Sequence, residues 1–415
     1  MRQRAISFLG IFVILALCWL FSPNKKIIPW RVVGWGMGLQ LLFGIFVLKT
    51  GPGLWLFDKL NDGMNALLGF TQEGSAFLFR SFVTGQVDSS FVNFTFQVLP
   101  TIIFFSSFMT VLYHVGVMQW VVRLFAVAMY KTMKTSGAET LSNAANIFVG
   151  QTEAPLVVKP YIEKMTQSEL MAIMVGGFAN TAGGVLAAYV GMLRDFFPDV
   201  AGHMIAQSVM SAPAALVCAK LAFPETKEPE TRSKMHVEVK KIDANAIDAA
   251  SRGATEGLHL AFNVAAMLLA FIALIAMANA LLGQAGNLIG WPNLSLQQVF
   301  GWVGWPLAWI MGVPSQDCFT VGQLLGVKTV VNEFVAYLQL ADMLKTGTPL
   351  SYRSVVIATY ALSGFANFSS IAIQIGGISG IAPTRRHDLA KLGLRAMIVG
   401  ALASFTTATI AGLLI

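Results

Sequence analysis

The chain has 415 residues, of which 55% are apolar even without counting glycine, and only 12% are charged. Soluble domains carry about 25% charged residues, so this chain has too little charge to cover the surfaces of a soluble protein of its length, and lipid must be the solvent for much of it. The formal net charge of +7 is spread through the loops between apolar runs, which indicates membrane orientation and not a nucleic-acid partner.

A helix needs about 20 predominantly apolar residues to cross a bilayer, and eight runs of the sequence come near that length. We therefore predict an all-α polytopic membrane protein with eight transmembrane helices and both termini on one side. The predicted spans are residues 5–21, 31–48, 97–119, 167–193, 202–223, 256–282, 352–376 and 389–414. The first run follows Arg2 and Arg4 as in a signal peptide, but no small-residue cleavage site follows it, so we expect a retained span.

The distribution of basic residues predicts the orientation of these spans. With the termini outside, nineteen Lys and Arg residues fall in the inner loops and span ends, and nine fall on the outer side. Because cytoplasmic loops are enriched in Lys and Arg, we predict that both termini face the periplasm and that the polar linker 224–252 is cytoplasmic. Segment 53–92 is amphipathic and punctuated by glycine, and we expect it to lie along the membrane interface.

Two apolar segments, 136–162 and 297–341, are interrupted and fit neither class. The first contains GQTEAP at 150–155, and the second contains GVPSQD at 312–317. A glycine and a proline among polar residues would break a spanning helix, and such breaks are tolerated in a membrane only where the backbone faces protein or a wet cavity. We therefore predict two re-entrant hairpins, the first entering from the inside and the second from the outside.

The order of hairpin, span and span occurs twice, in 136–223 and in 297–415, with one span between the two units. The second unit is therefore inverted relative to the first. The span after each hairpin contains the same tetrapeptide, GFAN, at 177–180 and at 364–367. Inverted repeats with broken helices are typical of secondary transporters, which bind their substrate at mid-membrane where the breaks converge.

Three acidic residues lie inside apolar segments: Glu153, Asp317 and Glu333. A charge at the bilayer centre costs at least about 2.5–3.5 kcal/mol, so each is either part of a binding site or a structural carboxylate at a helix end. Neutral polar side chains accompany them, namely Gln151, Thr152, Asn332, Asn367, Ser369 and Ser370. No Lys or Arg lies at either predicted hairpin tip or in the GFAN segments, which indicates a neutral substrate rich in hydroxyl and amide groups.

Helical spacing groups some of these candidates. Asn367 and Ser370 are three residues apart and share one face of a helix, with the ring of Phe365 nearby for a planar or apolar group. Asn146 lies one turn before the break at Gly150. An amide oxygen in that place is suited to hold Na⁺, although an intramembrane Asn also serves as an interhelical hydrogen-bond partner.

Three motifs carry a family resemblance: NIFVGQTEAP at 146–155, NEFVAY at 332–337 and GFANFSS at 364–370. In this order they resemble the concentrative nucleoside transporters. Asn at position 146 resembles the sodium-coupled branch of the bacterial members, because proton-coupled relatives tend to have a small hydroxyl residue there. The resemblance covers nearly the whole chain. It implies a homotrimer in the bacterial inner membrane whose protomers import nucleosides such as uridine by an elevator-type movement, with Na⁺ as the coupling ion and no other cofactor.

The resemblance also implies a division into scaffold and transport domains. Residues 1–135, with three spans and the interfacial helices, and residues 224–296, with the linker and the sixth span, would form the scaffold. Residues 136–223 and 297–415 would form the transport domain, each with one hairpin and two spans.

Site residues are carried over from the family one by one. The nucleobase contacts would be Gln151, Thr152, Glu153 and Val185, with Phe365 against the base. The ribose contacts would be Glu333, Asn367 and Ser370. The Na⁺ ligands would be Asn146 and the carbonyl of Val149, completed by Asn180 and Thr181. Asn180 departs from the pattern, because some sodium-coupled members have Ser in its place.

Three alternatives stay open at this point. Proton coupling would use Glu153 or Glu333 as a titrating carboxyl with a raised pKa. A membrane-embedded hydrolase or transferase would use the same two residues as an acid–base pair, but the inverted repeat and the absence of a nucleophile or metal motif in the sequence argue against an enzyme. A passive channel would not need two hairpins closing from opposite sides.

Overall fold

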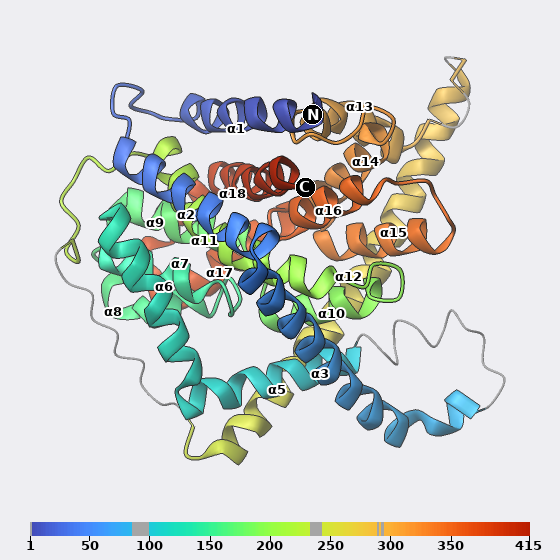
Figure 1. Cartoon of the computed structure of the whole chain (residues 1–415), viewed down its shortest axis with the longest axis horizontal. Coiled ribbons are helices and arrows are strands. Elements are labelled where there is room, and N and C mark those ends of the chain that lie inside the picture. Colours follow the sequence, from blue (N-terminus) through green and yellow to red (C-terminus); the bar gives the residue numbers. More distant parts are fainter. Residues whose placement is uncertain (1, 85–98, 233–242, 289, 292–293) are drawn as a thin grey trace.

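The computed structural model of the protein describes residues 2–84, 99–232, 243–288, 290–291 and 294–415. Within these ranges the regular secondary structure is entirely helical (Figure 1), which confirms the predicted all-α class. Five helical segments there are long and apolar enough to cross a membrane, and a bent helix pair makes a sixth if it is counted as one span. They are residues 2–20, 30–49, 167–193, 200–222 and 383–414. The count of eight spans stays a prediction.

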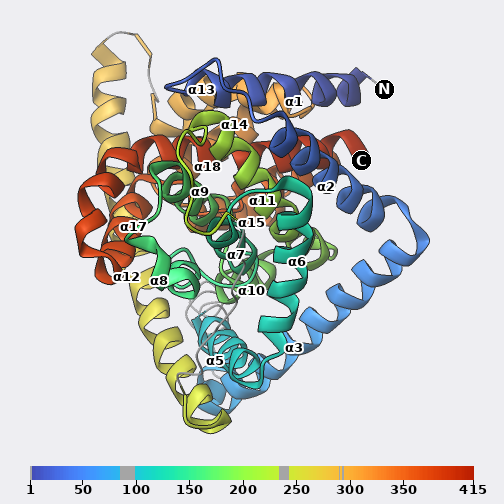
Figure 2. The ribbon, with the colours of Figure 1, turned by 90° about the vertical axis from the view of Figure 1, so that its left-hand side faces the viewer.

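One group of helices lies on the outside of the molecule. It comprises α1 (Arg2–Leu20), α2 (Trp30–Lys49), α3 (Gly51–Thr84), α5 (Leu99–Val115), α6 (Val117–Met133) and α12 (Ala246–Leu288). Figure 2 shows α3 and α12 running down opposite sides of the molecule and meeting α5 at one end. Large apolar side chains on this group, such as Trp120 and Phe262, are 68% and 65% exposed. Lipid or another protein chain must cover such a surface.

The predicted span 97–119 is not one straight helix. Helix α5 ends at Val115 and α6 begins at Val117, with a bend of 77° between them. Gly116 makes the bend with a φ of 98°, a conformation that glycine adopts without steric cost. Residues 97–98, like residues 85–92 of the predicted interfacial segment, lie outside the described residues, whereas residues 53–84 of that segment belong to the single helix α3.

The inner group consists of two series of helices that follow the two predicted units. The first series is α7 (Gly137–Ala145), η2 (Ala154–Val158), α8 (Lys159–Ile162), α9 (Gln167–Ala179), α10 (Gly183–Leu193) and α11 (Val200–Ala222). The second series is α13 (Leu296–Ile310), α14 (Cys318–Val330), α15 (Glu333–Lys345), α16 (Tyr352–Leu362), α17 (Phe368–Ile381), η3 (Pro383–Arg385) and α18 (Arg386–Leu414). In α11, 94% of the most apolar stretch is buried, against 28% in α1. Helices α9, α10, α11 and α18 of the two series therefore form the buried centre of the molecule, whereas α13 and α17 keep exposed apolar side chains such as Val303 and Phe368.

Both predicted spans that carry GFAN are broken, although we predicted them as uninterrupted. Helix α9 gives way to α10 at residues 180–182, and α16 gives way to α17 at residues 363–367. The polar residues at the breaks explain them: Asn180 has an extended backbone at the end of α9, and Asn367 caps α17 by accepting a hydrogen bond from a backbone N–H. The tetrapeptide therefore lies at the equivalent break in each unit. In the first unit it forms the end of α9, and in the second unit it directly precedes α17.

The predicted hairpin segments contain more than two helix breaks. Residues 146–153 separate α7 from η2, as expected, and residues 312–317 form the turn between α13 and α14. A further interruption at Val331 and Asn332 separates α14 from α15, and we did not predict it. It arises because Asn332 has an extended backbone and caps α15 with its side chain, so that Glu333 starts a helix. The entry of these segments into the membrane stays a prediction.

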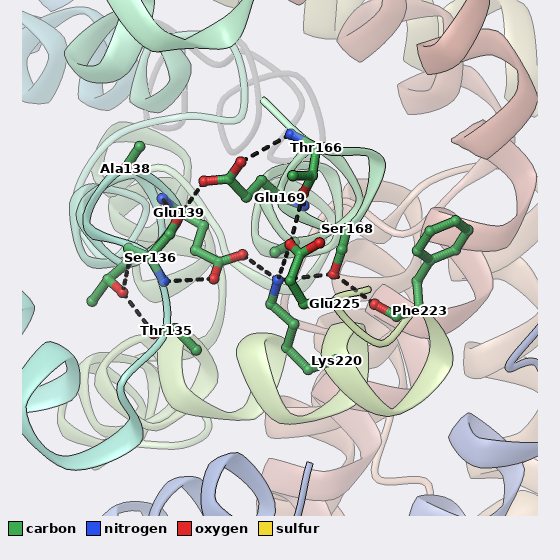
Figure 3. A network of polar contacts seen from close by, with 12 residues as sticks. Thr135, Ser136, Ala138, Glu139, Thr166, Ser168, Glu169, Lys220, Phe223 and Glu225 are labelled. Carbon is green, nitrogen blue, oxygen red and sulfur yellow. Dashed lines mark hydrogen bonds and ion pairs between the residues drawn. The ribbon is translucent and has the colours of Figure 1, made fainter. Parts of the chain in front are cut away.

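A buried polar network holds the base of the first unit together (Figure 3). Ser136 and Thr166 start α7 and α9, and each forms a capping box with the glutamate three residues later, Glu139 or Glu169. The Ser136 hydroxyl also donates to Glu169 Oε1 over 2.6 Å, and Lys220 Nζ lies 2.6 Å from Glu139 Oε2. Lys220 is therefore a buried ion-pair partner, whereas the charge count above placed it among the inner loops and span ends.

Asp317 has the corresponding place in the second unit. Its Oδ2 accepts hydrogen bonds from the backbone N–H of Ser351 at 3.1 Å, from the Ser351 hydroxyl at 2.9 Å and from the Ser354 hydroxyl. The carboxylate thereby joins the start of α14 to the start of α16, and it is buried. Of the two interpretations left open for Asp317, these contacts fit the structural carboxylate.

The two ends of the chain lie close together in both views. Arg4 Nη2 donates to the carbonyl of Ile415 over 2.7 Å. Both termini are therefore on one side of the molecule, as an even number of spans requires, and the membrane face stays a prediction. Residues 233–242 of the predicted linker lie outside the described residues, and Arg252 forms an ion pair with Asp243 at 2.6 Å next to them.

Candidate functional site

The breaks of the two GFAN spans lie against each other at the centre of the molecule. Gly364 has a φ of 97°, and a Cβ at this position would lie 2.6 Å from the carbonyl oxygen of Phe178 and 2.7 Å from that of Ala179. Thr181 Oγ1 lies 2.9 Å from Ser363 Oγ and accepts a hydrogen bond from the Gly364 N–H at 2.8 Å. Only glycine permits this close approach, so the shared motif brings the two units into backbone contact.

Glu333 is the buried carboxylate of this region. As the first residue of α15 it sits at the positive end of the helix dipole, with Asn332 as the cap. Its Oε1 accepts from the Tyr189 hydroxyl at 3.1 Å, and its Oε2 accepts from Asn367 Nδ2 at 2.8 Å. Each carboxylate oxygen has more than one acceptor position, so Glu333 retains acceptor capacity for hydroxyl groups of a ligand.

A second set of hydrogen bonds runs from α17 to the tip of the first unit. Asn367 Oδ1 accepts from the Ser370 N–H at 2.9 Å, and Gln151 Nε2 lies 3.3 Å from Ser370 Oγ. Gln374 Nε2 donates to Gln151 Oε1 at 3.0 Å and to the carbonyl of Met174 at 3.1 Å. Four predicted site residues, Gln151, Glu333, Asn367 and Ser370, are therefore brought together from both units.

The other predicted substrate contacts are less closely connected. Val185 is buried in α10, Phe365 is partly buried in the second break, and Thr152 packs on Gly377 of α17. Glu153 is exposed, and no hydrogen bond or ion pair joins it to the site residues that the structure describes. Its role toward a nucleobase stays a prediction.

The sequence analysis missed two residues of the site, Tyr189 and Gln374. Tyr189 lies four residues after Val185, and Gln374 lies four residues after Ser370, so each shares a helix face with a residue that was predicted. The ring of Tyr337 stacks on that of Tyr189 at 4.2 Å between centroids. Extending the predicted faces by one helical turn would have found both.

Lys328 is a basic side chain close to the site, although no Lys or Arg lies at the predicted hairpin tips or in the GFAN segments. The charge count placed it on the outer side, but it is fully buried five residues before Glu333. Its Nζ donates to the carbonyls of Ala361 at 2.7 Å and Ser363 at 3.1 Å. Because these carbonyls engage the ammonium group, a neutral substrate still fits the site.

Of the predicted Na⁺ ligands, Asn146 has the environment that a ligand needs. It is 1% exposed at the end of α7, and neither its Oδ1 nor its Nδ2 has a hydrogen-bond partner among the described residues. Buried polar atoms are nearly always satisfied, and a bound cation would satisfy this amide oxygen. The carbonyl of Val149 lies in the partly buried break that follows.

The other two predicted Na⁺ ligands already have protein partners. Asn180 Oδ1 accepts from the Ser211 hydroxyl, and its Nδ2 donates to the carbonyl of Gly176 at 3.1 Å. Thr181 Oγ1 forms hydrogen bonds with the Ser363 hydroxyl and the Gly364 N–H of the second break. An oxygen set of amides, hydroxyls and carbonyls fits Na⁺ chemically. Among the three predicted side-chain ligands, Asn146 is the one whose oxygen has no hydrogen-bond partner within the described residues, and Asn143 Oδ1 in the preceding turn of α7 shares this property.

Three family models together match most of the chain. Residues 203–412 match "Na+ dependent nucleoside transporter C-terminus", residues 9–82 match "Na+ dependent nucleoside transporter N-terminus", and residues 95–196 match "Nucleoside recognition". An uncharacterized transporter of Haemophilus influenzae is 44% identical over 412 residues, which cover 99% of this chain and 97% of that protein. The chain belongs to the Na⁺-dependent nucleoside transporter family. This confirms the resemblance seen in the motifs, and because the family consists of transporters, the enzyme alternative is rejected.

Other relatives of this chain are longer. Sodium/nucleoside cotransporter 1 of Mus musculus is 43% identical over 425 residues, which cover 99% of this chain but 64% of the mouse protein. Among solved structures, CNTnw in an inward-facing, substrate-bound state has a TM-score of 0.91 and 42% identity, covering 99% of this chain and 98% of CNTnw. A CNTnw variant in an intermediate state gives a TM-score of 0.92 at the same identity and coverage.

Proposed function

We propose that this transporter imports nucleosides, uridine-like ones among them, across the bacterial inner membrane by Na⁺ symport. The observation that carries the proposal is the hydrogen-bonded set that Glu333 and Asn367 of the second unit form beside Gln151 of the first. A ligand held between the two units must present two polar ends. A nucleoside does so, because it has a hydroxyl-rich sugar at one end and an amide-bearing base at the other.

The sugar and the base of a nucleoside each match one side of the site, the sugar at Glu333 and the base at Gln151. Glu333 is an ionisable acceptor with capacity left beside Tyr189 and Asn367, and a carboxylate is a stronger hydrogen-bond acceptor than a neutral group. Ribose hydroxyls suit this end. Gln151 and Gln374 present amides, and Gln374 Oε1 has no hydrogen-bond partner among the described residues. A pyrimidine base suits that end.

The unpaired oxygen of Asn146 supports Na⁺ as the coupling ion in preference to a proton. A cation bound there would fix the end of α7 and the break that leads to Gln151, so the substrate-binding side chain and the ion would be ordered together. Such coupling is reciprocal: Na⁺ raises the affinity for the nucleoside by the factor by which the nucleoside raises the affinity for Na⁺.

The arrangement of inner and outer helices supports an elevator-type movement. The buried inner series, residues 136–223 and 297–415, would move as the transport domain against the outer group from residues 1–135 and 224–296. The exposed apolar face of α12, with Met277 and Leu281 at 57% and 60% exposure, supports a homotrimer whose protomers or lipids cover it. Both termini would face the periplasm.

Equilibrium binding tests the proposal on purified protein. Uridine binding is measured in Na⁺ and in choline at constant ionic strength, at two pH values, and the recovered ligand is checked by mass. Tight binding in Na⁺ and weak binding in choline at both pH values is the expected result. Binding that follows pH and ignores Na⁺ would instead establish proton coupling, and absence of uridine binding under all conditions would refute the nucleoside assignment.

A further inference from the structure

Lys328 is a buried cation that substrate binding, as proposed above, does not use. It is 0% exposed near the end of α14, and its Nζ donates to two carbonyls and lies 5.7 Å from the centroid of the Phe405 ring. None of the ion pairs among the described residues includes it. It interacts electrostatically with the buried Glu333 carboxylate but forms no direct ion pair with it. A buried ammonium group is costly without direct polar contacts, so the groups that touch it must favour a cation in another way.

The carbonyls that bind Lys328 belong to the end of a helix. Ala361 lies in the last turn of α16, and Ser363 is its C-cap. Carbonyls in a last turn lack intrahelical partners, and they carry the negative end of the helix dipole. Carbonyl oxygens at the ends of half-helices are also the groups that hold Na⁺ in secondary transporters. Lys328 therefore satisfies these oxygens as a bound cation would.

The first unit has an equivalent place, and there the protein supplies no cation. At the end of α7, directly before a break, Asn146 is buried with its amide unpaired. The loop after it contacts the following span directly after its break, where the N–H of Gly183, the first residue of α10, donates to the carbonyl of Phe148 at 3.1 Å. Near the end of α14, shortly before the other break, Lys328 also contacts the following span, but through its ammonium group, which donates to the carbonyls of Ala361 and Ser363 at the end of α16.

We propose that the Lys328 ammonium group is a tethered cation that takes, in the second unit, the place which Na⁺ takes in the first. This inference rests on the proposed Na⁺ coupling. It makes Lys328 a positioning residue: by binding the carbonyl of Ser363 it fixes the start of the break that carries Asn367, the partner of Glu333. It also limits this chain to one exchangeable Na⁺, because the second cation place is permanently filled.

The test uses two substitutions that differ in the space they leave. Lys328→Ala opens a polar cavity beside the two carbonyls in which Na⁺ and water fit, whereas Lys328→Met fills most of the cavity with an apolar chain. Each substitution is combined with Asn146→Ala. The melting temperature of the purified, nucleoside-free protein is then measured as Na⁺ replaces choline at constant ionic strength. Gel filtration verifies folding.

The expected pattern is specific to a cation place. Asn146→Ala alone should lose the Na⁺ response of the wild type, the variant with Lys328→Ala should regain a Na⁺ response, and the variant with Lys328→Met should not. Equal Na⁺ responses of the two double variants would overturn the inference. If the variant with Lys328→Ala does not fold, a Na⁺ titration of the wild-type protein tests the inference instead. A Hill coefficient near one is expected, and two Na⁺ sites would overturn the inference.

A uridine-binding measurement separates this inference from the proposed function. With Asn146 intact, Lys328→Met should lower the affinity for uridine by about tenfold or more, since one lost charge-assisted contact of about 1.4 kcal/mol has that effect. Unchanged affinity in a folded Lys328→Met protein would overturn the positioning role. Failure of the wild type itself to bind uridine would refute the proposed function, whereas the nucleoside-free Na⁺ titration would still test Lys328.

Discussion

Replacing Glu333 with Gln tests the assignment of the sugar end of the site. Each oxygen of the Glu333 carboxylate accepts one described hydrogen bond, from Tyr189 at 3.1 Å and from Asn367 at 2.8 Å. The remaining acceptor positions are those we assign to ribose hydroxyls. Glutamine keeps the shape but turns one oxygen into a donor and removes the charge. Asn367 cannot turn its amide to compensate, because its Oδ1 accepts from the Ser370 N–H and from the Ser369 hydroxyl.

The size of the effect follows from the lost bond. A hydrogen bond to a charged group contributes about 1.5–3 kcal/mol, which corresponds to a factor of about 10 to 150 in affinity. We expect Glu333→Gln to weaken uridine binding by that factor. The deoxyuridine that lacks the partnered hydroxyl has already lost this bond, so it should lose much less. Free uracil should compete poorly with uridine in the unmodified protein.

Calorimetric titration at saturating Na⁺ with uridine, 2′-deoxyuridine and 3′-deoxyuridine measures this coupling as a double-mutant cycle. Tyr189→Phe is the matched control, because it removes one donor from the same carboxylate and leaves the acceptor positions assigned to the sugar in place. It should lower the free energy of unfolding by about 1.5–3 kcal/mol, since the lost hydrogen bond has a charged acceptor. If Glu333→Gln weakens uridine and both deoxyuridines equally, Glu333 does not bind the sugar and the ribose assignment must be abandoned.

Three further predictions concern the ion, the base of the first unit and the orientation. Asn146→Ala should raise the Na⁺ concentration needed for half-maximal uridine binding, and an unchanged Na⁺ dependence would place the ion elsewhere. Lys220→Met should destabilise the protein by about 3–5 kcal/mol in thermal unfolding because Glu139 is left buried without its cation; the double variant with Glu139→Gln should recover part of the loss, and no recovery would contradict the pairing. Cysteines introduced at Gln3 and Glu230 should be labelled from opposite sides of the membrane by an impermeant reagent, and labelling of both from outside would overturn the predicted orientation.

The sequence predicted the parts of the fold that depend on local composition. Hydropathy alone predicts α11 and α18, because each contains a long, predominantly apolar run. The motif GFAN pointed to the two places that meet, because its glycine at 364 permits a backbone contact that any side chain would prevent. The asparagine one turn before Gly150 pointed to the unpaired amide of Asn146, because polar side chains near a break face protein and not lipid.

The features that the sequence did not predict depend mostly on contacts between distant segments of the chain. A charge count treats every lysine as solvated, so it could not show that Lys328 lies against carbonyls of α16 or that Lys220 pairs with Glu139. The interruption at Val331 has no glycine or proline to signal it, and it became visible only through the cap at Asn332. The bend at Gly116 was hidden for the opposite reason, since a single glycine inside an apolar run is common in membrane helices.

Accumulation of labelled uridine in proteoliposomes tests the central claim most directly, when Na⁺ and H⁺ gradients are imposed separately on vesicles of equal ionic strength. An inward Na⁺ gradient should drive uptake above the equilibrium level, an H⁺ gradient alone should not, and the accumulated uridine should be chemically unchanged. Accumulation driven by the H⁺ gradient alone, or equilibration that neither gradient exceeds, would contradict Na⁺-coupled nucleoside import by this protein.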